Sequence, residues 1–245
     1  MHGARPEPPL AVLAAADDAR PAALAERLAL PLVETESAAL LLAYGADGLE
    51  LRAPGRRLTP LRVDFSHIGQ HGGGELLRAA RVKARPARLL DLTAGLATDA
   101  FRLARAGFEV LACERVPVIH ALVEDALSRA ATIPAPGRLE LRLGDARSVL
   151  ADPALPAPDV IYLDPMFPGE GRTALPRREL QLLRELTGDD DTGAELLALA
   201  RARARRRVVV KRPLHAPALA PEASLVFKGR AVRFDVYLIA GESVA

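Results

Sequence analysis

The middle of the chain alternates between short apolar runs and stretches of helical periodicity. Leu89–Leu92 is an apolar run of the kind found in buried parallel strands. From Thr98 onward, apolar residues recur at intervals of three and four, at Ala100, Phe101, Leu103 and Ala104. Thr93–Gly95, between the two, is a turn of small residues. The stretch therefore predicts strand, tight turn and helix, the opening unit of a nucleotide-binding α/β domain.

The same alternation continues toward the C-terminus. Apolar runs predict strands over Phe108–Glu114, Leu139–Asp145, Asp159–Asp164 and Val208–Pro213, and a closing antiparallel pair over Leu225–Arg230 and Val232–Ile239. Helical spacing predicts helices ending near Val82 and spanning Val118–Ala131, Pro176–Leu186 and Asp190–Ala204. Strands that alternate with helices indicate a Rossmann-like α/β fold with a parallel sheet, which we assign to residues 71–245.

The first 70 residues have a different pattern. Ala11–Leu30 is rich in alanine and predicts one or two helices. Ala38–Tyr44 and Leu49–Arg52 are apolar stretches separated by Gly45–Gly48, which predicts a β-hairpin, and Leu61–Phe65 predicts a third strand. We therefore expect a small N-terminal α+β subdomain over residues 1–70.

Composition and charge indicate a globular protein but do not indicate a particular function. With 245 residues, 50% of them hydrophobic, the chain is long enough for one large α/β domain and a small appendage. A net charge of +2 permits a nucleic-acid partner but does not require one. The single cysteine, Cys113, excludes an internal disulfide and a cysteine metal cluster. Arg5 and Glu7 interrupt any signal peptide, and no apolar run reaches the roughly 18 residues of a membrane span, so we expect a soluble, cytoplasmic protein.

Acidic residues stand at the ends of the first three predicted strands of the α/β domain. Asp91 precedes the turn at Gly95, where only one glycine of the dinucleotide fingerprint is in place. An acid beside a small turn suits a cationic ligand such as S-adenosylmethionine (SAM), which has a sulfonium and an ammonium but no phosphate. Glu114 can accept both ribose hydroxyls of an adenosine, a feature that SAM and NAD sites share. Asp145 can accept the adenine amino group, with the Ala146 N–H facing the ring.

The most specific motif is Asp164-Pro165-Met166-Phe167, at the end of the fourth predicted strand. An acid or amide, a proline, any residue and an aromatic residue occur in this place in enzymes that methylate exocyclic amines of bases. The lone pair of such an amine is delocalised into the ring, so the nitrogen is a poor nucleophile. Asp164 and the Pro165 carbonyl can accept its two N–H bonds and free the lone pair, while Phe167 can stack on the extruded base. A strand-terminal Asp-Pro turn without function is the alternative.

Other polar clusters carry weaker predictions. His67 and His71 are four residues apart, but the glycines around them disfavour the helix that would pair them, so we expect no metal site. The glycines at 72–74 either hold an anion at a helix start or form a linker. Cationic residues near the ends of the last strands predict a strip that contacts RNA phosphates, made of Lys211, Arg212, Lys228, Arg230 and Arg233.

Taken together, these segments resemble the RsmJ family of bacterial methyltransferases, which act with SAM on guanine N2 of 16S ribosomal RNA of the small subunit. The resemblance covers roughly residues 32–240 and rests on Asp91–Phe101, Glu114-Arg115, Tyr162–Pro168, Val208–Pro213 and Arg233–Tyr237. Where the family often has Gly-Arg, this chain has Ala97-Thr98. The resemblance implies a Rossmann-like SAM-dependent methyltransferase fold and cofactor contacts at Thr98, Asp99, Glu114, Arg115, Asp145, Ala146 and Asp164.

Three other functions remain open at this point. The first is another base-amine methyltransferase, acting on tRNA or on adenine N6 of DNA. The second is an NAD-dependent oxidoreductase, which the missing fingerprint glycines and the Asp164 turn disfavour. The third is a non-catalytic RNA-binding module, which the intact Asp164 turn disfavours. The expected partner is 16S ribosomal RNA or the small ribosomal subunit; the sequence leaves the oligomeric state open, and we expect a monomer.

Overall fold

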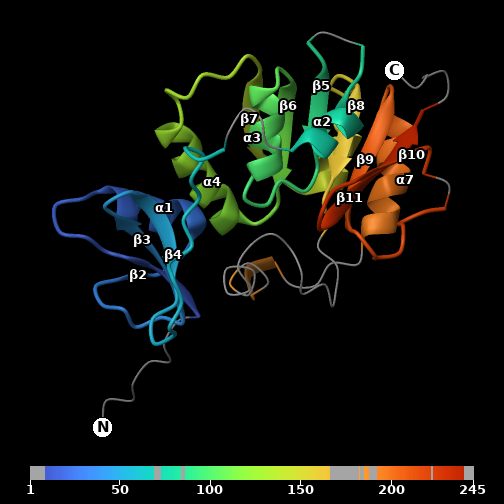
Figure 1. Cartoon of the computed structure of the whole chain (residues 1–245). Coiled ribbons are helices and arrows are strands. Elements are labelled where there is room, and N and C mark those ends of the chain that lie inside the picture. Colours follow the sequence, from blue (N-terminus) through green and yellow to red (C-terminus); the bar gives the residue numbers. More distant parts are fainter. Residues whose placement is uncertain are drawn as a thin grey trace.

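The described part of the chain forms two β-sheets with helices packed against them (Figure 1). The computed structural model describes residues 9–68, 73–83, 86–165, 182, 185–187, 192–221 and 223–239. None of the helices in these ranges combines the length and apolar composition that crossing a membrane requires. Strands β1 to β4 form one sheet and strands β5 to β11 form the other, which carries the functional site.

The strands of the larger sheet do not follow their order in the chain, as expected of a Rossmann-like fold, and this confirms the predicted α/β class. Its strands, from one edge to the other, are β10 (Leu225–Lys228), β11 (Val232–Leu238), β9 (Arg207–Pro213), β8 (Val160–Leu163), β5 (Arg88–Asp91), β6 (Glu109–Glu114) and β7 (Arg138–Leu143). Only β11 runs antiparallel to its neighbours, as the predicted closing pair requires. The other six strands are parallel, so their carboxyl ends meet at one edge of the sheet.

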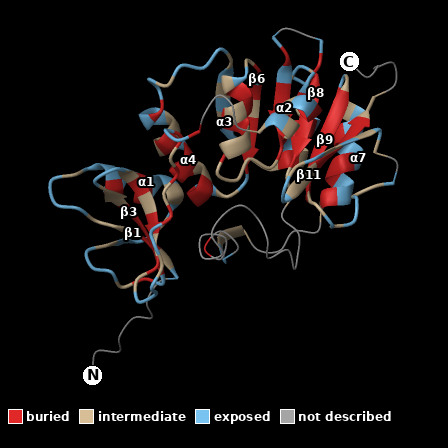
Figure 2. Ribbon diagram, viewed as in Figure 1, coloured by how far each residue is buried: buried red, intermediate tan, exposed pale blue. Residues whose placement is uncertain are grey.

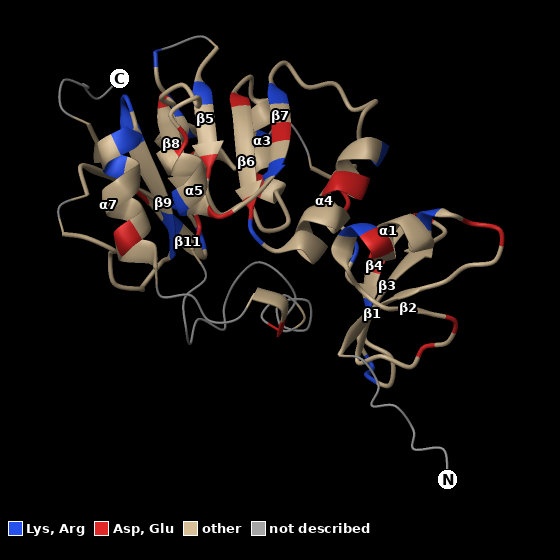
Figure 3. Ribbon diagram, turned by 180° about the vertical axis from the view of Figure 1, so that it is seen from behind, with Lys and Arg blue, Asp and Glu red and all other residues tan. Residues whose placement is uncertain are grey.

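Helices cover both faces of this sheet, because neighbouring residues of each strand point to opposite faces. Leu89 belongs to the apolar cluster that includes residues of α2 (Gly74–Ala80), α3 (Thr98–Arg105) and α4 (Pro117–Arg129). Leu90 belongs to the cluster of α5 (Ala146–Ala151) and α7 (Gly193–Arg203), which lie on the far face (Figure 3). Burial on both faces explains the continuous apolar runs of the sequence, and the central strands are buried along most of their length (Figure 2).

The smaller sheet has the order β2 (Leu32–Val33), β1 (Leu10–Leu13), β3 (Leu40–Gly45) and β4 (Gly48–Arg52), with helix α1 (Arg20–Leu28) against it. The predicted hairpin is confirmed as β3 and β4. The prediction of helix from Ala11 was wrong at its start, because Leu10–Leu13 pairs between β2 and β3 and this pairing overrides the helical preference of alanine. The predicted strand at Leu61–Phe65 is reduced to one bridge between Leu61 and Leu51.

The β3–β4 turn is anchored on helix α4 of the larger unit. Asp125 Oδ2 accepts the N–H of Leu49 at 3.1 Å and Nε of Arg129 at 2.8 Å. Gly48 has φ +119°, and a Cβ at this position would lie 2.6 Å from the same oxygen, so glycine is required. One continuous apolar cluster extends from β1 and β3 to α4 and the larger sheet. The two sheets therefore share one core, and the predicted domain boundary at residue 70 stays a prediction.

Candidate functional site

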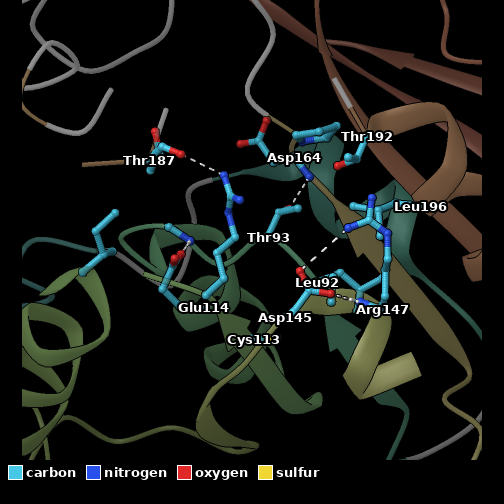
Figure 4. A pocket seen from close by; sticks show the side chains of 15 residues that line it. Leu92, Thr93, Cys113, Glu114, Asp145, Arg147, Asp164, Thr187, Thr192 and Leu196 are labelled. Atoms are coloured by element: carbon cyan, nitrogen blue, oxygen red, sulfur yellow. Dashed lines mark hydrogen bonds and ion pairs between the residues drawn. The ribbon is translucent and has the colours of Figure 1, made fainter. Parts of the chain in front are cut away.

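A pocket lies at the carboxyl edge of the larger sheet, where the ends of β5, β6 and β8 meet the start of α5 (Figure 4). Helix α7 closes one side. The residues that line it are Leu92, Thr93, Gly95, Cys113, Glu114, Arg115, Ile119, Asp145, Ala146, Arg147, Asp164, Pro165, Thr187, Thr192 and Leu196. The pocket thus forms where the order of strands reverses between β5 and β8, as expected for this fold.

Glu114 ends β6 and holds two backbone turns with its carboxylate. One oxygen, Oε2, accepts the N–H of Gly95 at 2.9 Å, and the other, Oε1, accepts the N–H of Val116 at 2.7 Å. Burial raises the pKa of Glu114, and these backbone donors only partly offset that effect. The side chain therefore has a fixed orientation in the pocket and lone pairs on both oxygens for a ligand.

Asp145 caps helix α5 beside the same pocket. Its Oδ1 accepts the N–H of Arg147 at 2.9 Å, which satisfies one of the N–H groups left unpaired at a helix start. Ala146 is the first residue of α5, so its own N–H has no partner within the helix. The guanidinium of Arg147 donates to both oxygens of Glu195 on α7, at 3.0 and 2.8 Å, and this ion pair joins the two helices at the pocket.

The turns that follow β5 and β8 are hydrogen-bonded to each other. The N–H of Asp164 donates to Oγ1 of Thr93 at 2.6 Å, and the N–H of Thr93 donates to Oδ1 of Asp91 at 3.0 Å. Asp164 and Pro165 line the pocket as predicted, and Phe167 lies outside the described residues. The predicted cofactor turn and the predicted acceptor turn are therefore one connected structure.

Asp91 and Asp99 lie beneath the pocket rather than on its wall. Asp91 is 1% exposed, and this burial raises its pKa to about 8. Asp99, one residue after Thr98 at the start of α3, accepts the hydroxyl of Tyr162 at 2.8 Å. Burial acts to raise the pKa of Asp99, but the neighbouring ammonium of Lys211 and the Tyr162 hydroxyl together bring it below its ordinary value.

Lys211 points into this carboxylate group and is only partly exposed to solvent. Its ammonium lies 2.8 Å from Oδ2 of Asp99 and 2.9 Å from Oδ2 of Asp164. Burial alone would lower the pKa of Lys211, but the two carboxylates raise it above its ordinary value. The prediction that Lys211 contacts RNA phosphate is therefore not supported, because both charges nearest to it belong to the protein.

The rest of the predicted basic strip divides into buried and exposed members. Arg212 is buried and donates from Nε and Nη2 to the carbonyl of Pro217 at 2.9 and 2.6 Å. Arg233 forms two hydrogen bonds to the buried carboxylate of Asp235, at 2.8 and 3.1 Å. These contacts argue against the predicted phosphate contacts of both arginines. Lys228 and Arg230, at the carboxyl end of β10, are exposed.

The structure brings most of the predicted cofactor residues to one pocket. Those that line it are Gly95, Glu114, Arg115, Asp145, Ala146 and Asp164, whereas Asp91, Thr98 and Asp99 do not. Sequence reasoning missed Thr93 and Arg147, although each is close in sequence to a predicted residue. It also missed Thr192 and Leu196, which approach from α7 and carried no local signal. Cys113 lines the pocket as well, and burial raises the pKa of its thiol to about 12, so it is no nucleophile.

The histidine pair gives no support for a metal site. His67 is exposed, with Nε2 3.8 Å from Oδ2 of Asp64, and His71 lies outside the described residues. Over the ranges that the structure describes, no three His, Cys, Asp or Glu side chains gather closely enough to hold a metal ion.

The chemistry of the pocket wall fits SAM. Three acidic side chains, Glu114, Asp145 and Asp164, supply acceptors for hydroxyl, amino and ammonium groups. Leu92, Ile119 and Leu196 supply apolar contacts for a purine ring and the aliphatic part of the methionine chain.

Comparisons with known proteins agree with this arrangement. Residues 23–239 match a family described as "Putative SAM-dependent methyltransferase". The chain is 42% identical over 230 residues to ribosomal RNA small subunit methyltransferase J of Coxiella burnetii (strain Dugway 5J108-111), covering 88% of this chain and 91% of that protein. The protein of the same name from Ectopseudomonas mendocina (strain ymp) is 43% identical over 233 residues, or 87% of each chain. The crystal structure of the SAM-dependent methyltransferase NGO1261 from Neisseria gonorrhoeae matches with a TM-score of 0.73 and 30% identity, over 96% of this chain and 97% of that one.

Proposed function

The chain belongs to the SAM-dependent methyltransferase family of ribosomal RNA small subunit methyltransferase J, and on that premise we propose that it methylates the exocyclic N2 amine of a guanosine in 16S ribosomal RNA. The observation that supports this target best is the Asp164-Pro165 turn, which lines the same pocket as Glu114 and Asp145. We expect the enzyme to act in the cytoplasm, as a monomer, on ribosomal RNA or the small subunit.

Each part of the cofactor has a matching group on the pocket wall or beneath it. Glu114 would accept the two ribose hydroxyls, because both of its oxygens are held in place by backbone N–H groups. Asp145 would accept the adenine amino group, and the Ala146 N–H would donate to the ring. The positive end of the molecule would favour the ionised form of Asp91, whose pKa is about 8 without ligand. Bound SAM supplies an electrophilic methyl group on its sulfonium.

Asp164 would align and activate the amine of the base. Its carboxylate and the Pro165 carbonyl would accept the two N–H bonds, so that the nitrogen lone pair is free to form the new N–C bond as the C–S bond breaks. The carboxylate also stabilises the positive charge that develops on nitrogen. Burial raises the pKa of Asp164 in spite of Lys211, which makes it a better acceptor for the proton that the methylated amine releases.

RNA would be recruited by the exposed cations at the end of β10. Lys228 and Arg230 lie at the carboxyl edge of the sheet, the edge that carries the pocket. Phosphate contacts of this kind add affinity without choosing the base and weaken with salt. Replacing both with Gln should raise the KM for RNA and flatten its salt dependence while the product stays unchanged. Lys83 is also exposed, and it precedes β5, whose other end carries the pocket. Lys83→Gln is therefore the matched control.

The deciding experiment is methyl transfer from labelled SAM to naked ribosomal RNA, to 30S subunits and to DNA, followed by mass spectrometry of the nucleosides. N2-methylguanosine in ribosomal RNA is the expected product, and N6-methyladenosine in DNA would move the protein to another class of base-amine methyltransferase. Asp164→Ala should abolish turnover while SAM still binds. The control Asp47→Ala changes an exposed carboxylate in the β3–β4 turn and should leave turnover intact. Full turnover by Asp164→Ala would place the amine acceptor elsewhere.

A further inference from the structure

Lys211 and Asp164 are neighbours across two paired strands. β8 and β9 run parallel with Leu163 opposite Val210, so the next residue of each strand, Asp164 and Lys211, falls at the same level and on the same face. Their side chains meet with Nζ of Lys211 2.9 Å from Oδ2 of Asp164. The sheet itself therefore sets the contact, and it does not depend on a loop.

A second set of contacts holds the ammonium in place. Oδ2 of Asp99 lies 2.8 Å from the ammonium and 2.8 Å from the Tyr162 hydroxyl. Oδ1 of Asp99 accepts Nη1 of Arg102 at 3.1 Å. Tyr162 is fully buried and lies two residues before Asp164 on β8, on the same face. Lys211 thus links Asp99, whose two oxygens both accept hydrogen bonds, to Asp164, which lines the pocket.

The two oxygens of Asp164 differ as a result. Oδ2 is held by Lys211, whereas Oδ1 receives no hydrogen bond from the residues that the structure describes. The backbone on the other side is fixed by the bond from the Asp164 N–H to Thr93. Asp164 is therefore held at its backbone N–H and at Oδ2, and Oδ1 is left to accept a ligand N–H.

We propose that Lys211 is a positioning residue for methyl transfer, which holds Asp164 through Oδ2 and keeps it ionised so that Oδ1 can accept an N–H of the target amine. The inference rests on the proposed function of Asp164 as the amine acceptor. The Lys211 side chain is 25% exposed and its ammonium lies between two carboxylates, so we assign its charge to Asp164 and not to RNA phosphate.

Two readouts test this inference, one of which does not depend on the RNA substrate. The first is the titration of the Asp164 carboxyl, followed by NMR of protein with ¹³C-labelled aspartate and assigned by its loss in Asp164→Asn. Lys211→Met should move this titration to higher pH, because the favourable charge is gone, and Lys211→Arg should restore it. Asp99→Asn should move the Asp164 titration to lower pH, because a repelling carboxylate is removed. This variant replaces Lys211→Met in the experiment if Lys211→Met does not fold.

The second readout is the kinetics of methyl transfer with ribosomal RNA. Lys211→Met should lower kcat about 100-fold, the scale of a displaced reacting group, with the KM for RNA unchanged. The acidic limb of its pH profile should move upward with the Asp164 titration. The control Lys83→Met makes the same chemical change at an exposed site and should alter neither readout.

The outcomes separate this inference from the proposed function. An unchanged Asp164 titration in Lys211→Met, or a raised KM for RNA with normal kcat, would overturn the positioning role. Absence of N2-methylguanosine with the wild-type enzyme would overturn the proposed target, and the titration would still decide whether Lys211 controls Asp164.

Discussion

Replacing Glu114 with Gln tests how the pocket holds the adenosine of SAM. The amide keeps the size of the side chain but can accept at only one of two positions, and its NH₂ group then faces a backbone N–H. In the wild-type protein both positions accept a backbone N–H, from Gly95 and Val116. The variant therefore loses its charge, leaves one buried N–H unpaired and turns one of the two acceptors proposed for the ribose into a donor.

The expected loss can be worked from the single charge-assisted hydrogen bond to the ribose. Such a bond contributes about 1.5–3 kcal/mol, which corresponds to a Kd about 10- to 150-fold weaker. The unpaired N–H should lower the free energy of unfolding by a further 1–3 kcal/mol or so in the absence of ligand. Calorimetry with SAM measures the first quantity, and urea unfolding measures the second.

The matched control is Glu109→Gln, which makes the same change at the exposed, opposite end of β6. It should leave both the SAM affinity and the stability unchanged. Wild-type SAM affinity in Glu114→Gln would refute the assignment of Glu114 to the ribose. If Glu114→Gln loses SAM affinity only under conditions in which it is partly unfolded, the effect comes from the turns at Gly95 and Val116. In that case Glu114 would not contact the ligand.

Three further predictions concern Asp91, Gly48 and Cys113. Because the pKa of Asp91 is about 8 in the folded protein and near 4 when unfolded, the native state binds the extra proton, so stability should fall as pH rises from about 4 to about 8; Asp91→Asn should flatten this slope in urea unfolding. Gly48→Ala should destabilise the protein more than Gly55→Ala, since both have positive φ but only the Cβ at 48 would meet the Arg129 side chain; equal losses would show that contact to be unimportant. Burial should protect the Cys113 thiol from iodoacetamide until the protein unfolds, and fast labelling of native protein would contradict that burial.

The sequence predicts the site well where the site follows from strand ends. Glu114, Asp145 and Asp164 each end a predicted strand and line the pocket, because parallel strands bring their carboxyl ends to one edge. Asp91 also stands near a strand end, but it is buried and does not line the pocket. Helix α5 was not predicted, because six residues are too few to show a helical period. Its start was nevertheless marked by Asp145, whose side chain caps it.

The roles of the cations could not be predicted from composition and position alone. Lys211 and Arg212 are adjacent in sequence, and both were expected to face RNA. In a strand they point to opposite faces, so one meets Asp164 and the other meets the Pro217 carbonyl. The register of β8 against β9 decides which residue faces Asp164. An apolar run in the sequence shows that a strand is present, but it does not show which residue of the neighbouring strand lies opposite each of its residues. The contribution of α7 depends on tertiary packing and carries no sequence signal.

The anchoring of the β3–β4 turn on α4 ties the stability of each sheet to contacts with the other. Asp125 and Arg129 hold the turn, Phe65 stacks on Phe101 with ring centroids 4.4 Å apart, and one apolar cluster spans both sheets. A chain cut between the sheets would expose these surfaces on both halves, so neither half retains the contacts that stabilise it. Loss of the small sheet in a truncated or proteolysed protein would therefore remove packing from helix α4, the helix that also carries Ile119 on the wall of the cofactor pocket.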